Sequence, residues 1–269
     1  MHTFFLLHDS MTECAYTLSL QQYNKKNLDE AATHIMCHLS LSASHSGDIK
    51  DAQLLADAIV KALCSKRNCR LALDVAKCNL AVSTRINDST RIFINTVQVS
   101  RILRKIGLPL QSAISYERAE KLARKSSDRG GSNLKDLADT VLGKGLALSQ
   151  CGKAHQTAAE RAFLVAIDMY AHMKNKKGEA IGVYNLALHY TQRKINSTKA
   201  ENLARRACTL VENKGTTSVE ACYLRASIAS SSGKHGAAMK LVSKARVLAL
   251  RYYGPKHVRT ATIARRLTY

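Results

Sequence analysis

The 269-residue sequence contains no tryptophan, two prolines and 13 glycines, and aromatic residues make up only 5% of it. Because proline and glycine are the residues that most often interrupt helices, their scarcity favours long and closely spaced helices. No apolar run reaches the length that a membrane-spanning helix needs. The apolar start, Met1–Leu7, has no basic leader and is too short for a signal peptide, so neither a membrane span nor a secretory leader is expected.

Acidic residues are also scarce, with 20 Asp and Glu against 41 Lys and Arg, which gives a formal net charge of +21. Such a balance favours acidic partners, namely an acidic protein segment, nucleic acid or an anionic membrane, without choosing among them. The few aromatic residues leave few platforms for stacking bases, which argues against sequence-specific RNA recognition. Contact with a nucleic-acid backbone through charge alone remains open.

The eight cysteines are scattered and form no Cys-x-x-Cys pair, so we interpret them as reduced core residues of a cytoplasmic protein. His34 and His38 have the four-residue spacing of a zinc pair, with Cys37 between them. No glutamate follows His34, however, and the neighbouring Ile35 and Met36 indicate core packing. We therefore predict no metal and no cofactor.

Motifs that would indicate an enzyme are missing too. The sequence shows no glycine-rich phosphate loop after a strand, no nucleophile elbow and no paired carboxylates. Gly143-Lys144-Gly145 lies inside a helical pattern with no preceding strand. We therefore expect a protein without enzymatic activity.

What the sequence does have is a recurrent alanine, one turn into each of six apolar helical patterns and behind a short polar turn. The alanines are Ala31, Ala72, Ala113, Ala159, Ala200 and Ala238, at intervals of 41, 41, 46, 41 and 38 residues. A fixed period of this size is typical of stacked supersecondary units. A small residue at this point lets two antiparallel helices approach closely, because a larger side chain would push their axes apart.

The period predicts an all-α superhelical solenoid of about six helix-turn-helix repeats plus a C-terminal capping helix. The hairpins are expected at about 10–42, 48–84, 91–123, 134–173, 178–213 and 217–252, and the cap at about 257–267. We predict a single domain over 1–269. The stretch 125–133, where the interval lengthens to 46, is rich in glycine, serine and charge, and is interpreted as a hinge or a break in the stack.

One segment of this fold has an alternative. Residues 91–103 are rich in β-branched side chains and, taken alone, indicate a strand. The 41-residue register requires a helix there. We predict the helix, because tertiary contacts commonly override local propensity.

The pattern of small and large residues in the fifth hairpin, Leu186-Ala187, Tyr190 and Ala200, resembles that of tetratricopeptide repeats. Units of about 41 residues, longer than the usual 34, resemble the kinesin light chain variety. Two stretches carry that resemblance: Tyr184-Asn185-Leu186-Ala187 and Tyr253-Gly254-Pro255-Lys256-His257. Many such repeats have a tryptophan that this chain lacks.

The resemblance implies a right-handed superhelix whose first helices line a concave groove that binds peptides or extended protein segments without catalysis. Asn185 resembles an asparagine that would bond the main chain of a ligand there. By register, the other residues expected to face the groove are Tyr16, Tyr23, Lys61, Arg101, Arg104, Lys105, Lys144, Tyr184 and Gln192. The plain alternative for the charged ones is a solvated helix face.

The predicted function is therefore a scaffold, adaptor, chaperone or regulator that binds a peptide or acidic protein segment in a basic groove. The alternative is a nucleic-acid-associated regulatory protein built from helical repeats. Arg101, Arg104 and Lys105 are three and four residues apart, so they share one face of a helix and form the centre of the predicted basic strip.

Overall fold

The computed structural model describes residues 2–41, 49–127, 134–194, 196–212 and 214–265, and these ranges contain thirteen α-helices and no strand. The helices are α1 (His2–Asn24), α2 (Leu28–Leu41), α3 (Ile49–Ser65), α4 (Cys69–Arg85), α5 (Ser89–Lys105), α6 (Pro109–Ser127), α7 (Leu134–Gln150), α8 (Gln156–His172), α9 (Lys176–Arg193), α10 (Ser197–Leu210), α11 (Gly215–Ser231), α12 (His235–Tyr252) and α13 (Val258–Arg265). A short 3₁₀ helix, η1 (Lys153–His155), precedes α8. The predicted all-α fold of six hairpins and a final helix is confirmed.

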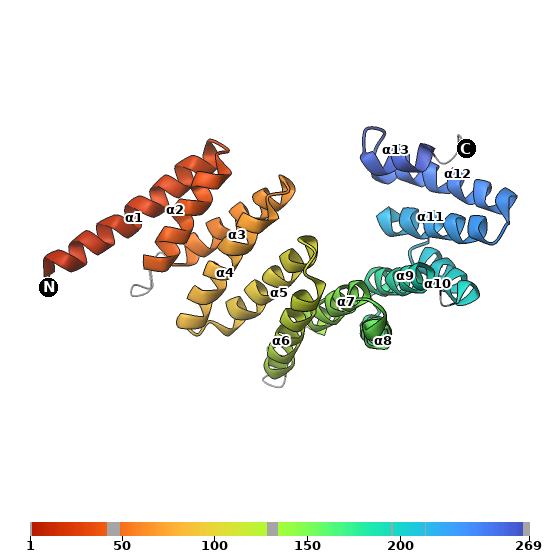
Figure 1. The fold of residues 1–269 in the computed structure, drawn as a ribbon, viewed down its shortest axis with the longest axis horizontal. Coiled ribbons are helices and arrows are strands. Elements are labelled where there is room, and N and C mark those ends of the chain that lie inside the picture. The colour runs from red at the N-terminus through yellow and green to blue at the C-terminus, as the bar shows by residue number, and fades with distance from the viewer. Residues whose placement is uncertain (1, 42–48, 128–133, 195, 213, 266–269) are drawn as a thin grey trace. The chain divides into compact units, whose positions relative to one another are not determined.

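The chain divides into two compact units, Met1–Gly130 and Gly131–Tyr269, and each is described by itself. Within each unit, helices that follow one another in the chain lie side by side (Figure 1). Unit 1 holds the hairpins α1–α2, α3–α4 and α5–α6. Unit 2 holds α7–α8, α9–α10 and α11–α12, with α13 against α12. The boundary falls within the predicted hinge 125–133, of which residues 128–133 lie outside the described ranges. The single domain over 1–269 stays a prediction.

The turns between helices repeat one backbone geometry. After α1, Lys26 adopts a left-handed conformation with φ of 62°. Its N–H donates to the Tyr23 carbonyl, and the N–H of Asn27 donates to the Gln22 carbonyl, both at 3.0 Å. This pair of bonds satisfies the last carbonyls of the helix in the manner of a Schellman motif. The same two bonds close the turns centred on Arg67, Asn87, Gly107, Lys174 and Gly233.

The residue after this left-handed position starts the next helix. Asp88 accepts a hydrogen bond from the N–H of Arg91 at 3.0 Å, and Asn175 accepts one from the N–H of Gly178 at 3.0 Å. An Asp or Asn side chain in this position satisfies an N–H group that the first turn of a helix leaves without a partner. Three residues are therefore enough to end one helix and begin the next, which keeps the hairpins tight.

The recurrent alanines are buried as predicted. All six lie in the second helix of their hairpins, and none is more than 6% exposed. Residues 91–103 form the middle of α5, so the helix that the register required is confirmed.

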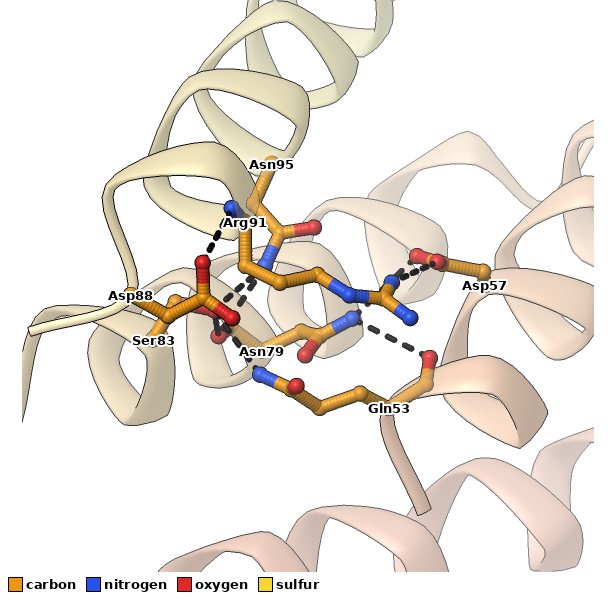
Figure 2. Close-up of polar contacts among 7 residues, drawn as sticks. All are labelled: Gln53, Asp57, Asn79, Ser83, Asp88, Arg91 and Asn95. Atoms are coloured by element: carbon orange, nitrogen blue, oxygen red, sulfur yellow. Dashed lines mark hydrogen bonds and ion pairs between the residues drawn. The ribbon is translucent and has the colours of Figure 1, made fainter. Parts of the chain in front are cut away.

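Buried polar side chains hold α5 in place, as Figure 2 shows. Asn95 of α5 donates its Nδ2 to Ser83 Oγ of α4 at 2.8 Å, and Gln53 of α3 donates its Nε2 to the same oxygen at 2.8 Å. Asn79 of α4 donates its Nδ2 to the Gln53 carbonyl at 3.3 Å. All four residues are at most 1% exposed. These bonds join three helices, which explains why a strand-like sequence is helical here.

The cysteines only partly match their predicted burial. Cys208 and Cys222 are buried, as predicted. Cys14 and Cys37 are exposed, so the prediction of core residues is wrong for them, and the other four are intermediate. α2 packs against α1, α3 and α4, and Cys14 and Cys37 lie outside the surfaces that these contacts bury.

Candidate partner-binding face

The ten predicted site residues all lie in the first helices of their hairpins. Six belong to unit 1: Tyr16 and Tyr23 in α1, Lys61 in α3, and Arg101, Arg104 and Lys105 in α5. Four belong to unit 2: Lys144 in α7, and Tyr184, Asn185 and Gln192 in α9. The two sets are considered separately, unit by unit.

Four cations form what we call the basic cluster of unit 1: Lys61, Arg101, Arg104 and Lys105. Arg104 is half-buried and the other three are exposed. Burial raises the pKa of the Tyr116 phenol in α6, and the charges of Arg101 and Arg104 lower it. Both guanidinium groups therefore lie close to the Tyr116 hydroxyl, as their shared helix face predicted.

Lys105 extends the basic cluster towards α3. Burial and the neighbouring Cys69 raise the pKa of the Cys64 thiol, and the charge of Lys105 lowers it. Lys105 at the end of α5 therefore lies near Cys64 at the end of α3, one helical turn after Lys61. The cluster covers the C-terminal ends of two neighbouring first helices.

No carboxylate within the described ranges forms an ion pair with any of these four cations. The acidic residue nearest along α3, Asp57, is already paired with Arg91 of α5 at 2.8 Å, as Figure 2 shows. Asp57 also accepts a hydrogen bond from Asn79 Nδ2 at 3.2 Å. Burial raises the pKa of Asp57 although Arg91 opposes the rise. The cluster is thus left with an excess of positive charge.

Tyr16 and Tyr23, unlike the basic cluster, belong to the packing of unit 1. Both are half-buried and pack against the hydrophobic core of unit 1. The Tyr16 ring lies 5.5 Å from the ring of buried His38, whose Nδ1 is 2.7 Å from the Thr12 carbonyl oxygen. His34, Cys37 and His38 are not part of any group of three metal-ligating side chains, and the described residues contain no such group.

In unit 2, the four predicted residues differ in environment. Gln192 is exposed, whereas Lys144, Tyr184 and Asn185 are half-buried. Asn185 donates its Nδ2 to the Ile181 carbonyl of its own helix at 2.8 Å. One amide hydrogen is therefore used locally, and the second N–H and the amide oxygen are the atoms available for a partner.

Tyr184 belongs to a cluster that the sequence pattern did not reveal, here called the tyrosine cluster: Tyr184, Glu220, Tyr223, Tyr253 and Arg259. Glu220 accepts from Arg259 Nε at 2.7 Å and from the Tyr253 hydroxyl at 3.0 Å. The Arg259 guanidinium lies 4.9 Å from the Tyr223 ring centroid. Burial and Glu220 raise the pKa of Tyr184 to about 12. One available sequence clue was the 39-residue interval from Tyr184 to Tyr223, which is close to the repeat period.

The surface hollow found in unit 2 lies elsewhere, on the second helix α10, and none of the ten predicted residues lines it. Two of its cations are already paired: Lys199 Nζ lies 3.6 Å from Glu160, and Arg206 pairs with Glu179. This pairing leaves the hollow little excess charge for an anion. No described helix is both long enough and apolar enough to cross a membrane.

No protein-family model and no curated protein matches the sequence. Solved structures do match the fold. The apo form of RapI has a TM-score of 0.62 at 9% identity, covering 89% of this chain and 83% of that one. The pilus biogenesis factor PilW has a TM-score of 0.57 at 12% identity, covering 94% and 98%. A Rap protein in complex with the Competence and Sporulation Factor has a TM-score of 0.56 at 13% identity, covering 96% and 74%.

These neighbours are tetratricopeptide-repeat proteins. The chain has the tetratricopeptide-repeat fold. At these identities the likeness establishes the fold alone, and the kinesin light chain variety stays a prediction. Four of the predicted residues, Lys61, Arg101, Arg104 and Lys105, lie in the C-terminal halves of α3 and α5, which are first helices of neighbouring hairpins in unit 1.

Proposed function

We propose that this tetratricopeptide-repeat chain is a non-enzymatic interaction scaffold that binds an acidic peptide or protein segment over the basic cluster of unit 1. The observation that carries the proposal is charge pairing. Lys61, Arg101, Arg104 and Lys105 form no ion pair with a described carboxylate, while Asp57 on the same helices is neutralised by Arg91. A surface with unbalanced positive charge attracts and orients an acidic segment.

The fold supports the same proposal. Among the three structures named above, the Rap protein was solved with a bound factor, the Competence and Sporulation Factor, so a fold of this kind does serve as a binding scaffold. We further propose that Lys144, Tyr184, Asn185 and Gln192 form the contact face of unit 2, and that Tyr16 and Tyr23 border the one in unit 1. The scattered cysteines of the sequence favour placing this activity in the cytoplasm.

A binding assay with matched charge reversals tests the proposal. The probe is a fluorescein-labelled peptide of alternating glutamate and glycine, and its anisotropy is followed on titration with the full chain. Lys61→Glu/Lys105→Glu should weaken binding about tenfold or more, because two attractive contacts become repulsive. The control, Arg70→Glu/Lys77→Glu, makes the same net charge change on exposed positions of the second helix α4 and should have a much smaller effect. Equal losses would show non-specific attraction and contradict the proposal.

The nucleic-acid alternative is tested in the same assay with a labelled single-stranded oligonucleotide. Contact with about four phosphates predicts a log–log salt slope of about −3, independent of base sequence. The peptide should show a shallower slope, and we expect it to be the better ligand at moderate salt. Tighter oligonucleotide binding that is lost in Lys61→Glu/Lys105→Glu would reverse the choice of partner.

Asn185 tests the proposed face of unit 2. Asn185→Ala should weaken a peptide that bonds it through its main chain by about fivefold or more, because a hydrogen bond goes unmade. The matched control Asn202→Ala, on the exposed surface of the second helix α10 and outside the proposed face, should have the smaller effect. A peptide whose affinity is unchanged by Asn185→Ala does not use that residue.

A further inference from the structure

Two thiols meet in the interior of unit 2. Cys208 of α10 and Cys222 of α11 have their Sγ atoms 3.5 Å apart, and the two residues are 3% and 0% exposed. They come from successive hairpins, because α10 closes the fifth hairpin and α11 opens the sixth. A contact between two thiols at this distance lies close to disulfide geometry, in which the sulfur atoms are about 2.05 Å apart. An approach of about 1.5 Å separates the contact from the bond.

The charges around the two sulfurs are positive. Arg225 of α11 and Lys244 of α12 both act on the pair, and no carboxylate is among the groups that do. Arg225 is half-buried, and its Nε is a buried atom without a hydrogen-bond partner. The hydrogen bond with Cys222, followed by the charges of Arg225 and Lys244, lowers the pKa of Cys208, while burial opposes the fall. The pKa of Cys222 is raised by the same hydrogen bond and by burial.

The two sulfurs are therefore chemically unequal. The positive charges of Arg225 and Lys244 favour the thiolate, which is the nucleophilic form of cysteine, and the directions of the two pKa shifts assign the thiolate to Cys208. A thiolate with a second thiol in contact is the arrangement that captures an oxidant and then resolves the product as a disulfide.

We propose that Cys208 and Cys222 form a reversible oxidation site, in which hydrogen peroxide converts the dithiol to an intramolecular disulfide that links α10 to α11. The Cys208 thiolate attacks one peroxide oxygen, an S–O bond forms, and the O–O bond breaks to release hydroxide. The Cys222 sulfur then attacks the sulfenic sulfur of Cys208, the S–S bond forms, and the S–O bond breaks as the Cys222 proton leaves with the oxygen in water. In total, two thiols lose two electrons and two protons, and one hydrogen peroxide becomes two waters.

The bond would act on the tyrosine cluster. Cys222 stands between Glu220 and Tyr223 in one turn of α11. Fixing Cys222 to the preceding hairpin therefore restrains the helix that carries both residues. Hydrogen peroxide is small, so a local opening of the α10–α11 contact is enough to admit it.

The sequence makes the test direct. Trypsin cleaves after Arg206, Lys214 and Arg225, so Cys208 and Cys222 fall in separate peptides with one cysteine each. The full chain is reduced, treated with hydrogen peroxide at neutral pH, blocked with iodoacetamide and digested without reductant. We expect a linked peptide that is lighter by two hydrogens than the sum of its parts and is lost on reduction. Separate, alkylated peptides under conditions that oxidise the exposed Cys14 and Cys37 would overturn the proposal.

Two serine variants test the order of the steps. With Cys222→Ser, a dimedone adduct should accumulate on Cys208, because the sulfenic acid has no resolving thiol. With Cys208→Ser, Cys222 should acquire far less adduct. The reverse pattern would overturn the assigned roles. The linked peptide in the unchanged chain needs no variant, so a folding defect in either serine variant leaves that test intact. Its result is also independent of whether an acidic peptide binds unit 1.

Discussion

Unit 1 and unit 2 share one repeat architecture but bring their helices together in different ways. Unit 1 uses buried amides and hydroxyls, with Gln53, Ser83 and Asn95 linking three helices. Unit 2 uses glycines facing large side chains: a Cβ on Gly178 would lie 2.3 Å from the Tyr170 ring, and one on Gly182 would lie 2.8 Å from Ile167. A recurrent alanine therefore sets the repeat, and different local contacts complete each unit.

The two units also differ in the groups that pair with their carboxylates. In unit 2, the Tyr170 hydroxyl donates to Asp139, the Tyr190 hydroxyl to Glu160 and the Tyr253 hydroxyl to Glu220. These bonds occupy carboxylates, as Arg91 occupies Asp57 in unit 1. The basic cluster of unit 1 is left without a described carboxylate partner, whereas Arg259 of the tyrosine cluster is paired with Glu220. This contrast is why we place the acidic partner on unit 1.

The largest effect is expected from filling a glycine contact in unit 2. Gly178→Ala should lower the free energy of unfolding by about 2–3 kcal/mol, because the new methyl group overlaps the ring of Tyr170, which is 1% exposed and held by Asp139. The matched control is Gly236→Ala in α12, where a Cβ meets no atom within 4 Å. This control should stabilise the protein by up to about 1 kcal/mol through helix propensity. Urea unfolding measures both, and equal changes would mean that the Tyr170 contact is not formed.

A smaller effect is expected from breaking the polar network of unit 1. Asn95→Ala should cost about 1–2 kcal/mol, because it removes the donor to Ser83 Oγ and to the Asn79 carbonyl inside a buried site. Asn202→Ala on the exposed surface of α10 is the control and should stay within about 0.5 kcal/mol of the parent. Hydrogen exchange by peptide should place the Asn95→Ala loss in unit 1. An equal loss of hydrogen-exchange protection in both units would contradict the idea that each unit is stabilised by its own contacts.

The sequence predicts the helices well because their causes are periodic. Buried alanines recur at about 41 residues. Gly107 ends a helix and Asn175 begins one through local backbone conformation and hydrogen bonding, which the residue type alone predicts. The register even overruled the β-branched run in α5. The sequence could not predict which contacts stabilise this helix, because Asn95 is linked to Gln53 through Ser83 and these residues lie on three different helices.

The candidate site was predicted only in part, for a related reason. Helical spacing alone places Arg101, Arg104 and Lys105 on one face of a helix, so the sequence is sufficient to predict it. The tyrosine cluster needs Arg259 to meet Glu220 from 39 residues away. The pair of Cys208 and Cys222 likewise needs the exact rotation of two helices. Such contacts depend on how side chains of different helices are oriented toward one another, which a single sequence does not predict. For the cysteines, the sequence also has no Cys-x-x-Cys spacing that would indicate a pair.

The smallest effect concerns a histidine of unit 2. His189 is 2% exposed, and its ring centroid lies 5.9 Å from that of Phe163. Burial, and then the charge of Arg193, lower its pKa below the ordinary 6.5, while Glu160 and the nearby backbone of Gln156 oppose the fall. The folded protein therefore keeps His189 neutral at a pH where the unfolded chain already binds a proton. The stability that this gives is complete above pH 6.5 and is lost as the pH falls towards the folded pKa.

The free energy of unfolding should accordingly decline below pH 6.5, with a contribution from His189 of at most about 1.4 kcal/mol per pH unit. His189→Leu removes the titrating ring and keeps an apolar side chain, so its stability should fall less steeply between pH 7 and 5, whatever its value at pH 7. Urea unfolding at several pH values measures the two slopes. Parallel curves for His189→Leu and the parent would show that His189 takes up its proton equally in both states, and the contrast between the units would then rest on the glycine contacts and the polar network alone.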